Sequence, residues 1–186
     1  MAGRQVIRRA AQVLRSGGIA AYPTEAVFGL GCDPLNRVAV DRLLRLKRRS
    51  PRLGLILVAA HEAQLADYLG PIPQDLARRM RRSWPGPQTW IAPASSACPL
   101  WLTGEHDGIA VRVSAHPVVR ALCAKADMAI VSTSANRSGH PPARSALGCR
   151  MRFGDKLDIV VGGRTGGAAK PTPIRDLVTD RIIRVA

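Results

Sequence analysis

The sequence predicts a single α/β domain in which a twisted, mixed sheet is flanked by helices. Apolar runs typical of buried strands alternate along the whole chain with segments whose apolar residues recur at helical spacing. The length of 186 residues and a hydrophobic content of 46% are sufficient for one large core. We therefore expect one domain over residues 1–186, without repeats or a linker.

The first half of the chain supplies the clearest helical pattern. Val6, Ala10 and Leu14 recur at helical spacing, and Asn36 is a residue type preferred at a helix N-cap. The run "LGLILVAA" is typical of a buried strand. In chain order, we expect a helix ending at Gly17-Gly18, a strand over 18–22, a helix from 36 to about 48, a strand over 53–60 and a short helix over 61–69.

The second half continues the alternation of helices and strands. Its first element is the basic helix "DLARRMRRSW", which a strand within "GPQTWIAP" follows. We then expect a loop over 94–107, strands over 108–114 and 128–132 with a helix over 116–125 between them, a helix over 143–152, and strands over 157–161, 174–178 and 181–185. The Gly-rich segment "GGRTGG" is expected to be a turn.

The charge balance indicates a polyanionic partner. The chain has 28 Lys and Arg against 13 Asp and Glu, a formal net charge of +15 and a pI of about 11.3. Such a surface attracts nucleic acid, although solvated arginine-rich faces would give the same numbers. On the basic helix, Arg78 shares a face with Arg81 or Arg82, and we expect this face to bind RNA weakly.

Several function classes are excluded by residue spacing. The four cysteines form no CxxC pair, so no metal site is expected. The N-terminus lacks a secretory signal, and no apolar run approaches the roughly 20 residues of a membrane span. A cytoplasmic location is therefore expected.

Four polar clusters lie at predicted strand ends or turns, where α/β proteins usually place their sites. They are "YPTE" (22–25), "KRR" (47–49), "STSANRSG" (132–139) and "KPTPIRD" (170–176). Each alone is compatible with ordinary turn chemistry. The "STSAN" loop offers hydroxyls, an amide and backbone N–H groups to an anion or nucleotide, and Lys47 and Arg49 would add the positive charge that phosphates require.

The familiar catalytic motifs are missing. The chain has no P-loop pattern and no GxSxG elbow, and its histidines have no evident acidic partner. His116, which precedes Pro117, is interpreted as a helix cap and not as a base. Any chemistry must then depend on positioning and charge.

An ordered set of motifs resembles the YrdC/Sua5 family, and within it the short bacterial TsaC type. The resemblance runs from about Val6 to Arg184 through "AYPTEAVFGLGCDP", "LLRLKRR", "GLILVAA", "WPGPQT", "WLTG", "AVRVSAHPVV", "STSANRSG" and "IRD". It implies a YrdC-like fold with an open basic cavity, without the C-terminal domain of the long Sua5 form. It also implies a nucleotidyltransferase that joins L-threonine, bicarbonate and ATP into threonylcarbamoyl-AMP and pyrophosphate, for modification of adenosine 37 in tRNA.

The same resemblance assigns roles to particular residues. Lys47 and Arg49 would be catalytic and would hold the ATP phosphates. The further ATP-binding residues would be Ser132, Ser134, Asn136 and Arg184, and the threonine-binding residues Thr24, Arg112 and Thr172. Glu25 would orient the substrate wall or have a structural role. Mg²⁺ would come with ATP, no residue is assigned as a metal ligand, and the partners would include proteins of the TsaB, TsaD and TsaE type.

The chain departs from the family pattern at three positions. Ser50 precedes Pro51 where many relatives have Pro directly after K-x-R, Val58 stands where long relatives carry His, and Pro173 replaces a polar residue. Two alternative functions stay open on the residues. One is a non-enzymatic RNA-binding or rRNA maturation factor using the basic face, and the other is a transferase module of the kind within longer hydrogenase maturation proteins.

Overall fold

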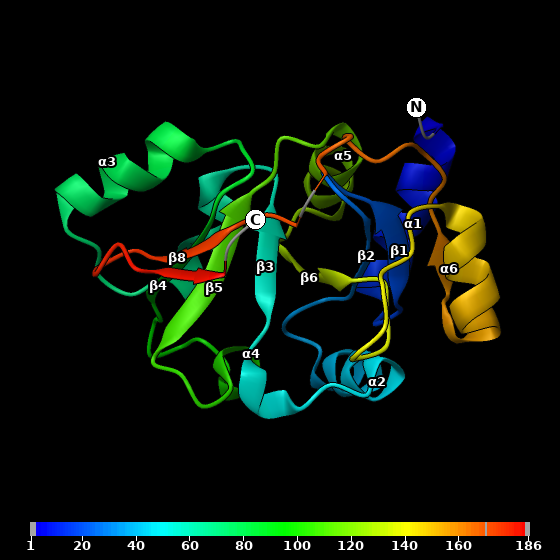
Figure 1. Ribbon diagram of the computed structural model, residues 1–186, viewed down its shortest axis with the longest axis horizontal. Helices are drawn as coiled ribbons and strands as arrows, with labels where there is room; N and C mark the ends of the chain where they lie inside the picture. Colours follow the sequence, from blue (N-terminus) through cyan, green and yellow to red (C-terminus); the bar gives the residue numbers. More distant parts are fainter. Residues whose placement is uncertain (1–2, 170, 185–186) are drawn as a thin grey trace.

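A nine-stranded mixed sheet forms the centre of the computed structural model, which describes residues 3–169 and 171–184 (Figure 1). The strand order is β7-β1-β2-β6-β3-β5-β4-β8-β9. Three neighbouring pairs, β1–β7, β3–β5 and β4–β8, are parallel and the others are antiparallel. The strands are β1 Ala20–Pro23, β2 Phe28–Gly31, β3 Ile56–Ala59, β4 Thr89–Pro93, β5 Gly108–Val113, β6 Ile130–Ser134, β7 Ile159–Val160, β8 Ile174–Asp176 and β9 Ile182–Arg184. The predicted single-domain α/β class with a mixed sheet is confirmed.

Two of the helices begin at the caps that the sequence predicts. The Asn36 side chain accepts a hydrogen bond of 3.0 Å from the Ala39 amide, and the His116 ring accepts one of 3.3 Å from the Val118 amide. The helices are α1 Arg4–Arg15, α2 Arg37–Lys47, α3 Gln74–Ser83, α4 Leu100–Thr103, α5 Pro117–Ala126 and α6 Ala146–Phe153, with 3₁₀ turns η1 Pro51–Leu53, η2 Glu62–Tyr68 and η3 Gly154–Lys156. None of the helices in this described part of the chain is long and apolar enough to cross a membrane.

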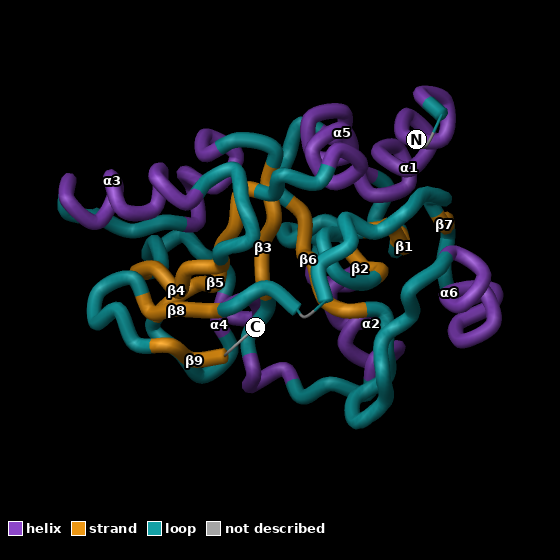
Figure 2. Tube along the Cα trace, turned by 45° about the horizontal axis from the view of Figure 1, so that its top comes forward, coloured by secondary structure: helices purple, strands orange, loops and turns teal. Residues whose placement is uncertain are grey.

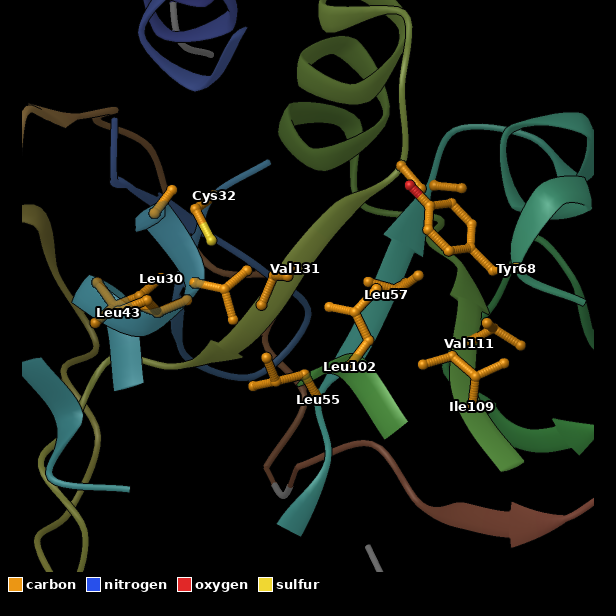
Figure 3. Close-up of a cluster of buried hydrophobic side chains, with 14 of the residues drawn as sticks. Leu30, Cys32, Leu43, Leu55, Leu57, Tyr68, Leu102, Ile109, Val111 and Val131 are labelled. Carbon is orange, nitrogen blue, oxygen red and sulfur yellow. The ribbon is translucent and has the colours of Figure 1, made fainter. Parts of the chain in front are cut away.

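The sheet buries a separate apolar cluster on each face, because successive side chains of a strand point to opposite sides. Helices α1 and α5 lie together on one face (Figure 2) and cover Tyr22, Val58 and Ile130. The opposite face packs against α2, α3, α4 and α6. Figure 3 shows part of this second cluster, in which Leu43 of α2 and Leu102 of α4 pack with strand residues.

Strand β2 is the main element that the sequence analysis missed. Its sequence, Phe-Gly-Leu-Gly, contains two glycines, which are depleted in strands. The structure needs Gly31 because a Cβ there would collide with the Val131 carbonyl and the Tyr22 hydroxyl. Close packing of backbone against backbone thus explains a strand that propensity disfavours.

Two smaller differences concern local structure. The predicted loop over 94–107 contains the short helix α4, and the predicted helix over 61–69 is the 3₁₀ turn η2. The last predicted strand extends to Val185, which lies outside the described residues. The segment after β7 crosses the sheet to reach β8 near the opposite edge (Figure 1, orange), and it forms one wall of the cavity described below.

Candidate active site

A cavity of about 910 Å³ opens where α1 and α5 no longer cover their face of the sheet. Alternate residues of the central strands form its floor, including Ile56 of β3, Ala110 of β5 and Ser132 of β6. Seven of the nine residues that the resemblance assigns to substrates line this cavity: Thr24, Arg49, Arg112, Ser132, Ser134, Thr172 and Arg184. The fold therefore brings together residues that are distant in the sequence.

Arg112 is the centre of a buried polar network. Its Nη1 atom donates a hydrogen bond of 2.5 Å to Oγ1 of Thr172, and Nη2 lies 3.3 Å from Oε2 of Glu25. Glu25 Oε1 accepts a hydrogen bond of 2.6 Å from the Ser114 hydroxyl. The Nε atom of Arg112 is buried without a partner among the described residues. An unpaired buried donor is costly, so an acceptor that reached this N–H would be strongly favoured.

The charge of Glu25 is stabilised by this network. Burial tends to raise the pKa of Glu25, but the positive charge of Arg112 and the Ser114 hydroxyl outweigh burial and hold the pKa below its ordinary value. The carboxylate therefore stays ionised at neutral pH and fixes one side of the Arg112 guanidinium. The sequence analysis did not identify Ser114 as a site residue, although Ala110, Arg112 and Ser114 follow the two-residue period of one strand face.

Three guanidinium groups converge on the cavity from different segments. Arg49 donates from Nη2 to the Gly54 carbonyl at 3.0 Å, and Arg184 donates from Nη2 to the Thr172 carbonyl at 2.6 Å. Loss of solvent around the Arg184 guanidinium, followed by the charges of Arg112 and Arg49, lowers its pKa. Arginine nevertheless stays protonated in proteins. The cavity therefore has a permanently positive end.

Thr24 lies in the tight turn that joins β1 to β2. Its amide donates to the Val27 carbonyl at 3.0 Å and its hydroxyl donates to the same oxygen at 2.7 Å. The residue is buried and lines the cavity. The polar cluster "YPTE" after the first strand thus forms both a hairpin turn and part of the cavity wall.

The segment "STSAN", which spans the end of β6 and the start of the loop after it, is divided between the cavity and the layer behind it. Ser132 and Ser134 line the cavity, whereas Asn136 and Lys47 do not. The Ser134 hydroxyl donates to Oδ1 of Asn136 at 2.6 Å. Lys47 Nζ lies among the oxygens of this loop, and it is only 3% exposed. Two of the nine assigned residues therefore stand behind the cavity wall.

The acidic residues of the cavity lining were not foreseen. Glu105, His106 and Asp107, from the loop before β5, line the cavity together with Asp176. No pattern in this loop distinguishes it from ordinary polar loops. Within residues 3–169 and 171–184, no three His, Cys, Asp or Glu side chains are grouped as a metal site would require.

The three departures from the family pattern lie in different local environments. Ser50 caps the turn η1 by accepting a hydrogen bond of 3.3 Å from the Arg52 amide. Val58 is buried under α5 and does not line the cavity. Pro173 precedes β8, and its carbonyl accepts a hydrogen bond of 3.2 Å from the Thr89 amide.

Comparisons with known proteins agree with this geometry. A family model for the Sua5/YciO/YrdC domain, described as "Telomere recombination", matches residues 12–186. A threonylcarbamoyl-AMP synthase of Halorhodospira halophila is 56% identical, covering 91% of this chain and 89% of its own length. The enzyme of the same name from Methylobacillus flagellatus is 52% identical, covering 92% and 94%.

Solved structures show the same fold. The Sua5 protein of P. abyssi, crystallised with L-threonine, is 35% identical with a TM-score of 0.87, covering 94% of this chain and 51% of that one. E. coli YciO is 26% identical with a TM-score of 0.86, covering 98% and 89%. The chain belongs to the Sua5/YciO/YrdC family. The curated relatives are named as threonylcarbamoyl-AMP synthases, which confirms the nucleotidyltransferase class and ATP as its substrate.

Proposed function

We propose that this chain joins L-threonine, bicarbonate and ATP into threonylcarbamoyl-AMP and pyrophosphate. The observation that carries the proposal is the convergence of Arg49, Arg112 and Arg184 on one cavity that hydroxyl groups also line. The reaction brings a carboxylate, a carbamate and a triphosphate together, so its main requirement is the neutralisation of negative charge.

In this proposal the threonine lies against Thr24, Arg112 and Thr172. Its carboxylate accepts from Nε of Arg112, the donor that has no partner in the described part of the chain. Glu25 and Thr172 bind the other two nitrogens of the guanidinium, so the guanidinium is oriented before the substrate arrives. The hydroxyl group of the substrate threonine forms hydrogen bonds with Thr24 and Thr172.

The ATP phosphates lie at the positive end, against Arg49 and Arg184. Ser132 and Ser134 face them, and Asn136 supports Ser134. Mg²⁺ accompanies ATP as part of the substrate and is held mostly by phosphate oxygens and water. Ser132 and Ser134 line the cavity with hydroxyl oxygens, and the described residues contain no group of three His, Cys, Asp or Glu side chains that could hold the ion without the phosphates.

The proposed chemistry requires no strong base. The threonine amine and bicarbonate condense to a carbamate with loss of water. A carbamate oxygen then attacks the α-phosphorus of ATP. The bond between the α-phosphorus and the α,β-bridging oxygen breaks, and pyrophosphate leaves with that oxygen. Because the attacking group is already an anion, alignment and positive charge are sufficient. His116, whose ring caps α5, takes no part.

The product would supply tRNA modification in the cytoplasm, through partners of the TsaB, TsaD and TsaE type. Weak RNA binding by α3 is a second activity that a specific observation favours. Arg78 and Arg82 are exposed on one face of this helix and form no ion pair within the described residues. Arg81, which the sequence analysis gave as an alternative to Arg82 on this face, instead forms an ion pair of 2.9 Å with Glu62.

The deciding experiment is pyrophosphate release by the purified protein. We expect release from ATP only when both threonine and bicarbonate are present, with threonylcarbamoyl-AMP detected by mass spectrometry. Release without threonine would indicate an ATP pyrophosphatase, and no release under any condition would favour the RNA-binding alternative.

A further inference from the structure

Lys47 occupies an unusual place at the end of α2. It is the last helical residue, and Arg48 turns the chain with a left-handed backbone (φ 51°), so the Lys47 side chain lies beneath the loop after β6. Its exposure of 3% is very low for a lysine. No carboxylate of the described chain forms an ion pair with it.

Oxygen atoms of the loop surround the ammonium group. Nζ donates to the Ser134 carbonyl, to the Asn136 carbonyl at 2.7 Å, and to Oδ1 of Asn136 at 3.3 Å. An ammonium has three N–H donors, and these three acceptors use all of them. A phosphate could be bound by Lys47 only if a loop contact were broken.

The loop is in turn arranged around this ammonium. Oδ1 of Asn136 accepts from both Lys47 Nζ and the Ser134 hydroxyl, while Nδ2 donates to the His140 carbonyl at 2.7 Å. The Ser138 amide donates to the Lys47 carbonyl at 2.8 Å, which ties the loop to the helix end a second time. The position of the Ser134 hydroxyl, which faces the cavity, is thereby linked to Lys47.

We propose that Lys47 is a positioning residue that acts through Ser134 and Asn136 and does not contact the ATP phosphates. Its ammonium lies among the loop oxygens and neutralises them as a bound cation would. The inference rests on the proposed synthase activity and replaces the role expected for Lys47 from the sequence. Burial, and after it the charge of Arg49, lowers the pKa of Lys47 to about 8, which is compatible with a mostly charged ammonium at neutral pH.

A double-mutant cycle tests the link to Ser134. We expect Lys47→Met and Ser134→Ala each to lower kcat about 10–100-fold, the range known for residues that orient metal ligands from behind, with little change in KM for ATP. The double variant should be no slower than the slower single variant, because both changes remove one unit. The proposal would be overturned if the two losses in kcat multiplied in the double variant, or if Lys47→Met raised KM for ATP and left kcat unchanged.

A measurement on the wild-type chain avoids dependence on how the variants fold. Among the described lysines, Lys125 and Lys156 are exposed and Lys47 is buried, so ¹⁵N-lysine labelling should show a Lys47 ammonium signal strongly protected from solvent exchange. With saturating α,β-methylene-ATP, this signal should keep its protection and show no scalar coupling to ³¹P. Coupling to ³¹P would show direct phosphate contact and refute the role. Failure of the synthase assignment would appear separately, as absent pyrophosphate release.

Discussion

Arg112 and Thr172 are 60 positions apart, yet Nη1 of Arg112 donates a hydrogen bond of 2.5 Å to the Thr172 hydroxyl. The backbone carbonyl of the same threonine accepts from Arg184 at 2.6 Å. Thr172 is therefore held between two arginines, one on β5 and one on β9. This arrangement joins the segment before β8 to the floor of the cavity.

The first prediction concerns Arg112 itself. We expect Arg112→Lys to lower kcat/KM for threonine about 10–100-fold, because a lysine cannot keep the contacts with Thr172 and Glu25 and also bind a carboxylate. Steady-state pyrophosphate release at varied threonine measures this. Arg120→Lys, on the exposed side of α5, is the matched control and should behave as wild type. Equal activity of the two variants would remove Arg112 from the threonine site.

Substrate analogues provide the second prediction. A site that hydrogen-bonds the threonine hydroxyl should reject 2-aminobutyrate by at least about 100-fold in kcat/KM, since the polar groups of the site would be left unpaired. Serine, which lacks only the methyl group, should lose about 10–200-fold. Competition assays with each amino acid give the ratios. Comparable turnover of 2-aminobutyrate and threonine would contradict hydroxyl recognition by Thr24 and Thr172.

A third prediction follows from the lowered pKa of Glu25. Its folded pKa lies below the ordinary value of 4.5, so the unfolded chain binds the proton more readily. The contribution of Glu25 to stability is therefore complete above pH 4.5 and is lost as the pH falls through the folded pKa. Glu25→Gln should differ most from wild type in urea unfolding at neutral pH, and the difference should shrink below pH 4.5. A gap that is constant across this range would argue against the linkage.

Gly31 supplies a fourth prediction, on stability alone. Gly31→Ala should lower the free energy of unfolding by about 1–3 kcal/mol, because the new Cβ meets the Val131 carbonyl and the Tyr22 hydroxyl in a closely packed region. Gly162→Ala is the control, since its Cβ would meet no atom within 4 Å. Thermal or urea unfolding of both variants is the measurement. Similar stability of the two would mean that β1, β2 and β6 can separate without cost.

The fifth prediction concerns RNA. Arg78→Glu/Arg82→Glu should weaken tRNA binding uniformly across sequences and reduce the slope of log affinity against log salt by about one for each lost phosphate contact. Arg81→Glu should have a smaller effect, because that guanidinium already binds Glu62. Anisotropy titrations at several salt concentrations separate the variants. An unchanged slope in the double variant would exclude this face of α3.

Local chemistry was sufficient to predict most elements and the polar clusters from which several cavity residues come. Periodicity placed most helices and most strands, and residue type alone identified the caps Asn36 and His116, because capping depends on neighbours in the chain. The resemblance added residues such as Arg112 and Thr172. Seven of the nine residues that it assigned to substrates line the cavity.

Contacts between distant segments decided what local patterns cannot express. Strand β2 exists because a glycine permits close approach to β6 and Tyr22, although its own propensity opposes a strand. The orientation of Arg112 depends on Glu25 and Thr172, which come from opposite ends of the chain. Lys47 faces loop oxygens because the end of α2 packs against the loop after β6, and no spacing rule in the sequence records that packing.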